Sequence, residues 1–138
     1  MLKGSNQSGF SMVELLMVVV IVGLLATVAV PSLLSSRDAA EKAATIGALR
    51  TIHSYQTTYL AQRGRYARIN ELNAYFTNTL GTTSGSRVLR GKYTYINGLT
   101  NRTTLATRYQ LWAIKYVGSR AETTFVMEQG GVIEAVEL

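Results

Sequence analysis

Twenty consecutive residues without a charged side chain constrain this chain more than any other feature. They run from Leu15 to Leu34 and read LLMVVVIVGLLATVAVPSLL. At about 1.5 Å per residue, an α-helix of this length spans about 30 Å, which is the thickness of the hydrocarbon core of a bilayer. The residues that follow, 35–138, are about as polar as a soluble domain. We therefore expect one membrane-spanning helix followed by one soluble domain.

The composition excludes several classes of site. The chain has no cysteine, so it can form no disulfide, no thiolate-bound zinc or iron–sulfur site and no catalytic thiol. The single histidine, His53, excludes a multi-histidine metal site, and we expect it to be exposed or hydrogen-bonded rather than catalytic. One aspartate and no G-x-S-x-G or P-loop pattern leave almost no material for catalysis. We predict no enzyme, no metal and no cofactor.

A short polar leader, residues 1–9, precedes the apolar block and allows two kinds of processing. Its one charged side chain, Lys3, favours a cytoplasmic N-terminus. An ordinary secretory signal would be cut within the apolar block, after a small residue such as Ala29. The alternative is cleavage before the block, which leaves the block in the mature protein. Glu14 favours this alternative, because a charge at the start of a membrane segment is costly and a discarded segment gains nothing from it.

The segment SGFSMVELLMVVVIVGLLATVAVPSLL resembles the N-terminus of a type IV prepilin, and its mature phenylalanine resembles the type IVa subclass. Gly9 matches the residue before the cleavage site, Phe10 the first mature residue, Glu14 the fifth and Pro31 the twenty-second. The pattern is specific because a cleavage signal, one acidic residue and a membrane-spanning segment occur at fixed distances from one another. The resemblance covers about residues 1–60. It implies that a prepilin peptidase cuts after Gly9 and methylates Phe10, and that the subunits polymerise into a filament.

The chemistry of Glu14 agrees with this implication. Cleavage after Gly9 creates an α-amino cation at Phe10. In a core of packed apolar helices, the Glu14 carboxylate would be a buried, unpaired charge, and pairing with the Phe10 amine of a neighbour removes that penalty. Ser11 and Glu14 also fit a capping box, in which Glu14 serves its own helix. With Gly9 and Phe10 in place, we favour the assembly role.

Two residues inside the apolar segment weaken a helix. Pro31 cannot donate a backbone hydrogen bond and clashes with the carbonyl four residues earlier, and Gly23 lowers helix propensity. In a membrane such residues are tolerated where neighbours satisfy the freed backbone groups. One interpretation is a kink that serves packing. The other, implied by the resemblance, is local melting between Gly23 and Pro31 when the subunit enters the filament.

The rest of the chain predicts an α+β fold: a long N-terminal α-helix packed on a small antiparallel β-sheet. Apolar residues three and four apart continue the helix to about Arg63, and a short helix is expected at 69–76. Strands are expected at 92–96, 108–117, 123–128 and 132–136, with loops at 81–86 and 97–104. We divide the chain into a leader (1–9), a transmembrane and filament-core helix (10–34), the amphipathic second half of that helix (35–63) and a head with an αβ-loop and the sheet (64–138).

Charges are segregated along the head. Between Arg63 and Arg120 there are ten basic residues and one acid, Glu71, whereas residues 121–138 contain four glutamates and no base. One interpretation is that basic and acidic surfaces pack against each other between subunits. The other is a basic stripe that contacts DNA or another anion, for which we nominate four residues: Arg87, Arg90, Lys92 and Arg102.

Three functions are compared on this basis. The first is a type IV pilin that serves adhesion, twitching motility or DNA uptake, anchored in the inner membrane and then part of an extracellular pilus. Its partners would be identical subunits, the prepilin peptidase, an inner-membrane assembly platform, minor pilins and DNA. The second is the major pseudopilin of a type II secretion system. The third, an enzyme or a plain anchored domain, has almost no support in the sequence.

The resemblance separates the first two functions only in part. Major pseudopilins typically carry a calcium site in their C-terminal loops, and calcium takes several carboxylate and carbonyl oxygens. The one aspartate of this chain, Asp38, lies in the long helix, which favours the pilin. Many type IVa pilins close a C-terminal loop with a disulfide, which this chain cannot form. That departure leaves room for a minor pilin.

Overall fold

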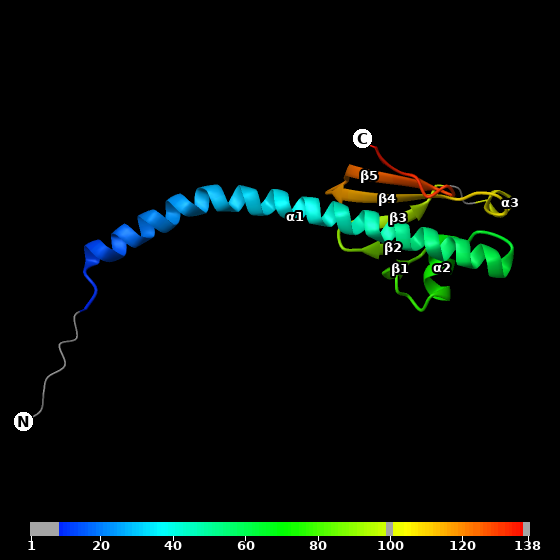
Figure 1. Ribbon diagram of the computed structural model, residues 1–138, viewed down its shortest axis with the longest axis horizontal. Helices are drawn as coiled ribbons and strands as arrows, with labels where there is room; N and C mark the ends of the chain where they lie inside the picture. The colour runs from blue at the N-terminus through cyan, green and yellow to red at the C-terminus, as the bar shows by residue number, and fades with distance from the viewer. Residues whose placement is uncertain (1–8, 99–100, 137–138) are drawn as a thin grey trace, which may run out of the picture. The chain divides into compact units, whose positions relative to one another are not determined.

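The computed structural model describes residues 9–98 and 101–136, except the side chain of Arg102. The chain divides into two compact units, the first ending at Glu41 and the second beginning at Lys42. The helix α1 (Met12–Arg63) contributes to both units, as Figure 1 shows. The expected long helix is therefore confirmed, with its first residue two positions later than predicted.

In the first unit, α1 has no packing partner among the residues that the structure describes. Every side chain from Met12 to Ala40 is exposed. The helix contains an 18-residue window with a mean hydropathy of 2.8, and by length and composition it could cross a membrane. The helix continues through Pro31. Just after it, the hydroxyls of Ser35 and Ser36 both donate to the carbonyl of Ser32, so these polar groups are satisfied within the helix.

The second unit is an antiparallel sheet with the rest of α1 along one face (Figure 1). Each strand pairs with its neighbour in sequence, which gives the order β1-β2-β3-β4-β5-β6. The α+β fold predicted from the sequence is confirmed. The further elements are α2 (Ile69–Tyr75), β1 (Thr82–Ser84), β2 (Arg87–Arg90), β3 (Tyr93–Asn97), α3 (Arg102–Leu105), β4 (Gln110–Val117), β5 (Arg120–Glu128) and β6 (Ile133–Val136).

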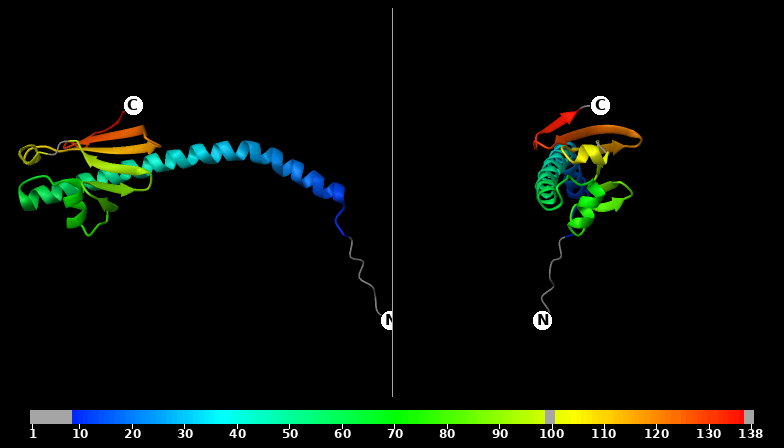
Figure 2. Two further views of the ribbon diagram at one scale, coloured as in Figure 1. Left: turned by 180° about the vertical axis from the view of Figure 1, so that it is seen from behind. Right: turned by 90° about the vertical axis from the view of Figure 1, so that its right-hand side faces the viewer.

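The core lies between α1 and one face of the sheet. The α1 residues Leu49, Ile52 and Tyr59 are buried at helical spacing, and they face alternate residues of the strands. The sheet contributes its own buried set from β3, β4 and β5: Tyr95, Leu111, Ala113, Phe125 and Met127. Because strand residues alternate between faces, the residues between these in sequence point away from α1. The right-hand view of Figure 2, which looks along α1, shows the helix on one side of the sheet.

The segment 81–86, expected as a loop, instead contributes to a hairpin of β1 and β2. Thr83 pairs with Val88, and Gly85 occupies the turn with φ 60°. The hairpin is held by Asn73 of α2, which is fully buried. The Asn73 amide donates to the Gly81 carbonyl and to the Thr83 hydroxyl, and its carbonyl accepts from the Leu80 amide. These contacts join residues seven to ten positions apart. The polar residues at 81–86, taken by themselves, therefore suggested a loop.

The second expected loop, 97–104, is also partly wrong. Its end forms the short helix α3, because the Asn101 side chain accepts a hydrogen bond from the Thr103 amide and caps the first turn. The four strands expected from composition are all present, although β5 begins three residues earlier than predicted, at Arg120.

Candidate functional site

The expected processing site lies directly before the first turn of α1. Gly9 and Phe10 are exposed and outside regular structure, and Phe10 is 78% exposed. The Leu15 amide donates to the Ser11 carbonyl, which is the first hydrogen bond of the helix. A Cβ on Gly9 would meet no atom within 4 Å. The fold of the described residues therefore gives no reason for a glycine at this position.

Glu14 lies in the first turn of α1, where a negative charge interacts favourably with the helix dipole. Its side chain is exposed, and so are the apolar side chains around it. The large exposed side chains continue from Phe10 through Leu34. A continuous apolar surface of this size is covered in nature by lipid or by other protein chains. The geometry thus places one acidic group at the start of an apolar surface that needs a partner.

Gly23 and Pro31 both lie within the continuous helix, so the described single chain contains no melted segment between them. A Cβ on Gly23 would meet no atom within 4 Å, so the fold of the isolated chain gives no reason for a glycine there. Their proposed role in local melting stays a prediction.

The four nominated anion contacts do not form one cluster. Arg90 and Lys92 are exposed on either side of the turn at Gly91, whereas Arg87 lies at the other end of β2. The side chain of Arg102 lies outside the described residues. Another pair of basic residues, Arg63 and Arg65, lies at the end of α1 and has no local sequence signal that marks it as a site. There, Arg63 lies 5.7 Å from the ring centroid of Tyr75, and Arg65 lies 5.6 Å from that of Tyr59.

Arg65 is also the centre of an ion pair that orders the αβ-loop. Its guanidinium Nη1 lies 3.1 Å from Oε2 of Glu71. The hydrogen bond to Glu71 raises the pKa of Arg65. Partial burial acts to raise the pKa of Glu71, but the hydrogen bonds from Arg65 and from the Arg68 amide lower it more, so its net shift is downward. The one acid in the basic region is therefore already engaged.

Two other titratable side chains have partners within the chain. His53 is half-buried, and its Nδ1 lies 2.7 Å from the Tyr109 hydroxyl, which confirms a satisfied histidine. In the acidic C-terminal region, Glu122 forms an ion pair with the buried Lys115 at 2.9 Å. Within the described ranges 9–98 and 101–136, no group of three or more His, Asp or Glu residues could hold a metal ion.

Comparisons with known proteins agree with this arrangement. Residues 4–30 match the family model of the prokaryotic N-terminal methylation motif. The chain is 29% identical over 65 residues to the type II secretion system core protein G of Klebsiella michiganensis, covering 47% of this chain and 46% of the relative. It is 30% identical over 64 residues to the protein of the same description from Pectobacterium carotovorum subsp. carotovorum, covering 46% and 41%. The matches span less than half the length of these curated relatives.

The methylation motif, the exposed apolar part of α1 and the antiparallel sheet of the second unit make this chain similar to pilin-like proteins. The motif and the two relatives support the family of type IV pilins and type II secretion pseudopilins. The apolar helix and the motif also support anchoring in the inner membrane before assembly.

Proposed function

We propose that this chain is a structural subunit of a filament, cleaved after Gly9 and assembled through α1. The observation that carries the proposal is the position of the processing motif at the start of α1, whose large apolar side chains from Met12 to Leu34 are all exposed. After cleavage, that surface would pack against the same surface of other subunits. The amine of Phe10 on one subunit would pair with Glu14 of its neighbour, which sets the axial stagger because only one offset satisfies both charges.

The N-terminal mass of the protein extracted from cell envelopes tests this proposal first. We expect a chain that starts at Phe10 and carries one additional methyl group. A start near Val30 would mean an ordinary secretory signal, and the filament proposal would then be wrong. This readout needs no assumption about the kind of filament.

For the kind of filament, we propose a pseudopilus of a type II secretion system as the first candidate, because both named relatives are core proteins G of such systems. A type IV pilus, the first choice from the sequence, is the second candidate. The observation that supports it is the position of the single aspartate, Asp38, in α1. The C-terminal region therefore lacks an aspartate for the calcium site that major pseudopilins typically carry. Deletion of the gene separates the two: loss of protein secretion supports the pseudopilus, and loss of surface filaments, twitching or DNA uptake supports the pilus.

In either filament, we propose the same set of partners: identical subunits, the prepilin peptidase, an inner-membrane assembly platform and minor subunits. We also propose that α1 loses helical structure between Gly23 and Pro31 on assembly, since these two residues weaken the helix most. Replacement of both by alanine would keep the segment helical. Hydrogen exchange in assembled filaments measures this directly, and protection of 23–31 equal to that of the flanking turns would contradict the proposal.

A further inference from the structure

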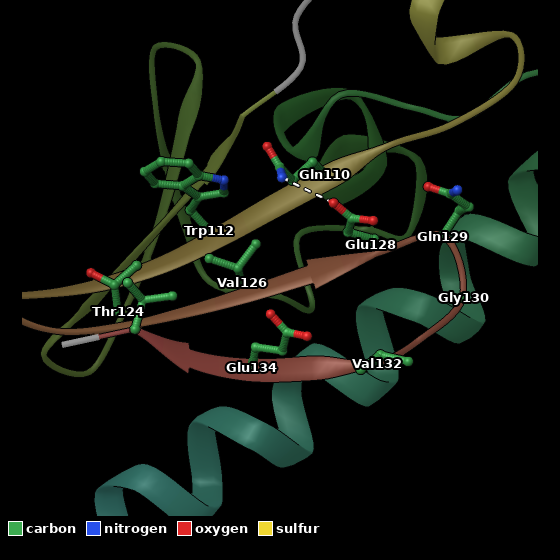
Figure 3. A pocket seen from close by; sticks show the side chains of 10 residues that line it. Gln110, Trp112, Thr124, Val126, Glu128, Gln129, Gly130, Val132 and Glu134 are labelled. Carbon is green, nitrogen blue, oxygen red and sulfur yellow. Dashed lines mark hydrogen bonds between the residues drawn. The ribbon is translucent and has the colours of Figure 1, made fainter.

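A groove lies on the face of the sheet that points away from α1, across β4, β5 and β6. Its cavity volume is about 640 Å³, within the range of sites for small ligands and single side chains. Figure 3 shows the side chains that line it. They include the only tryptophan of the chain, three valines and several polar groups. The residues used below are Gln110, Trp112, Thr124, Val126, Glu128 and Glu134.

Strand register sets the order of these side chains. Trp112 pairs with Val126 on β5, and Val126 pairs with Glu134 on β6. One row further along, Gln110 pairs with Glu128, and the Gln110 amide donates to Oε1 of Glu128 at 3.1 Å (Figure 3). An indole ring and an apolar floor therefore lie beside two carboxylates on one face of the sheet.

The two carboxylates are close and lack a counterion. Glu128 and Glu134 are diagonal neighbours on β5 and β6, a relation that puts their Cα atoms about 7–8 Å apart. The lining of the groove contains no Lys or Arg, and neither glutamate forms an ion pair within the part of the chain that the structure describes. Two carboxylates at this separation repel each other, and a cation between them would relieve that repulsion.

The groove also contains polar groups without partners. Thr124 is only 1% exposed, yet its hydroxyl has no hydrogen-bond partner among the described residues. The same holds for the buried indole N–H of Trp112. Both atoms are shielded from solvent, so the surface that a ligand meets in this groove is the indole ring of Trp112 and the two carboxylates.

We propose that this groove binds a basic side chain presented by a partner polypeptide. The guanidinium or ammonium group would lie over the face of Trp112, as in cation–π contacts, and between Glu128 and Glu134. Its alkyl stem would pack on Val126. Two carboxylates are too few for a divalent metal, which takes six or more oxygens in the case of calcium. A neutral sugar would leave both charges uncompensated.

The location of the groove suits an external partner. α1 covers the opposite face of the sheet, so the groove lies on the face that this helix leaves open. In a filament, every subunit would present the same groove, and weak contacts would combine into strong attachment. This repetition rests on the proposed function, but binding to a single subunit does not.

The single tryptophan makes the test site-specific, since intrinsic tryptophan fluorescence reports only on Trp112. The full-length protein in detergent is titrated with the peptide Gly-Arg-Gly-Arg-Gly, and Gly-Gln-Gly-Gln-Gly is the neutral control. We expect a saturable change with the arginine peptide only. Glu134→Gln and Glu128→Gln should each weaken binding about tenfold, the effect of one charge-assisted hydrogen bond. Glu41→Gln makes the same charge change outside the groove and should have no effect.

Four results would overturn the proposal. They are no saturable change, equal binding of the neutral peptide, an equal change with Ca²⁺ or methyl glucoside, and a change with protein concentration alone, which would mean that a second copy fills the groove. Both glutamates are exposed, so their variants should fold, and thermal unfolding checks this. A wrong filament proposal would appear in the N-terminal mass and would leave the fluorescence result unaffected.

Discussion

The side chain of Gln56 forms two hydrogen bonds with the backbone of Ala67. Its Nε2 donates to the Ala67 carbonyl and its Oε1 accepts from the Ala67 amide, both at 2.8 Å. Both residues are fully buried. The Gln56 side chain thus pairs with both backbone groups of Ala67, as a neighbouring strand would. These two bonds attach the loop after α1 to α1 itself.

Replacement of Gln56 by leucine should destabilise the head by about 2–4 kcal/mol, because it leaves a buried N–H and a buried C=O without partners. Urea unfolding followed by circular dichroism measures the loss. Thr57→Ala changes the next residue, which is exposed, and should cost much less. A loss below about 0.5 kcal/mol for Gln56→Leu would mean that water replaces both bonds.

Glu14→Ala should leave cleavage intact and impair incorporation into filaments. The carboxylate is exposed, so its removal costs the isolated chain little more than a favourable interaction with the helix dipole. The N-terminal mass checks cleavage, and the amount of subunit in sheared or sedimented filaments checks assembly. Glu41→Ala, also on α1, serves as the control. Normal filaments from the Glu14 variant would refute charge pairing with Phe10.

Gly81→Ala and Gly47→Ala should shift stability in opposite directions. Gly81 has φ 148°, and a Cβ there would lie 2.3 Å from the Leu89 carbonyl oxygen, so strand β2 must move. We expect a loss of about 1–3 kcal/mol. Gly47 lies within α1 with no atom near its Cβ position, so alanine should stabilise the helix by up to about 1 kcal/mol. Thermal unfolding of both variants decides this, and equal shifts would contradict it.

Stability should fall as the pH rises above about 10. Burial, together with the neighbouring Tyr66, raises the pKa of Tyr109, so the native state keeps this phenol proton while the unfolded chain loses it at about pH 10. The unfolded state then binds fewer protons, and the free energy of unfolding decreases with pH. Tyr109→Phe should reduce this slope between about pH 9 and about pH 11 in urea titrations. The exposed Tyr116→Phe should leave the slope unchanged.

Any DNA binding by the head should be strongly salt-dependent, because it would rest on arginine and lysine contacts to phosphates. Filter retention of double-stranded DNA by purified filaments gives the slope of affinity against salt. Arg90→Gln combined with Lys92→Gln should lower that slope, and Arg50→Gln on α1 is the matched control. Retention that is absent, or insensitive to salt, would remove DNA from the set of partners.

The long helix and the strands were predictable because their signals are local. A charge-free block and apolar residues three and four apart indicate one helix to Arg63, and tyrosine, threonine and valine runs indicate β3 to β6. The processing motif was equally readable, since it is a short pattern of adjacent residues.

The hairpin at Thr82 and the Trp112 groove were not predictable because both depend on residues distant in sequence. The hairpin is tied to the buried Asn73 side chain, eight to ten residues earlier. The groove exists because register brings Trp112, Val126 and Glu134 into one row from three strands. Neither alternation nor composition specifies which residues become neighbours across strands.

The strand order also has a kinetic consequence. Because each strand pairs with the one before it, every step in building the sheet closes a short loop, apart from the longer connection between β3 and β4. Short-range pairing of this kind lowers contact order and favours rapid folding. The head should therefore form strand by strand, without waiting for distant parts of the chain to meet.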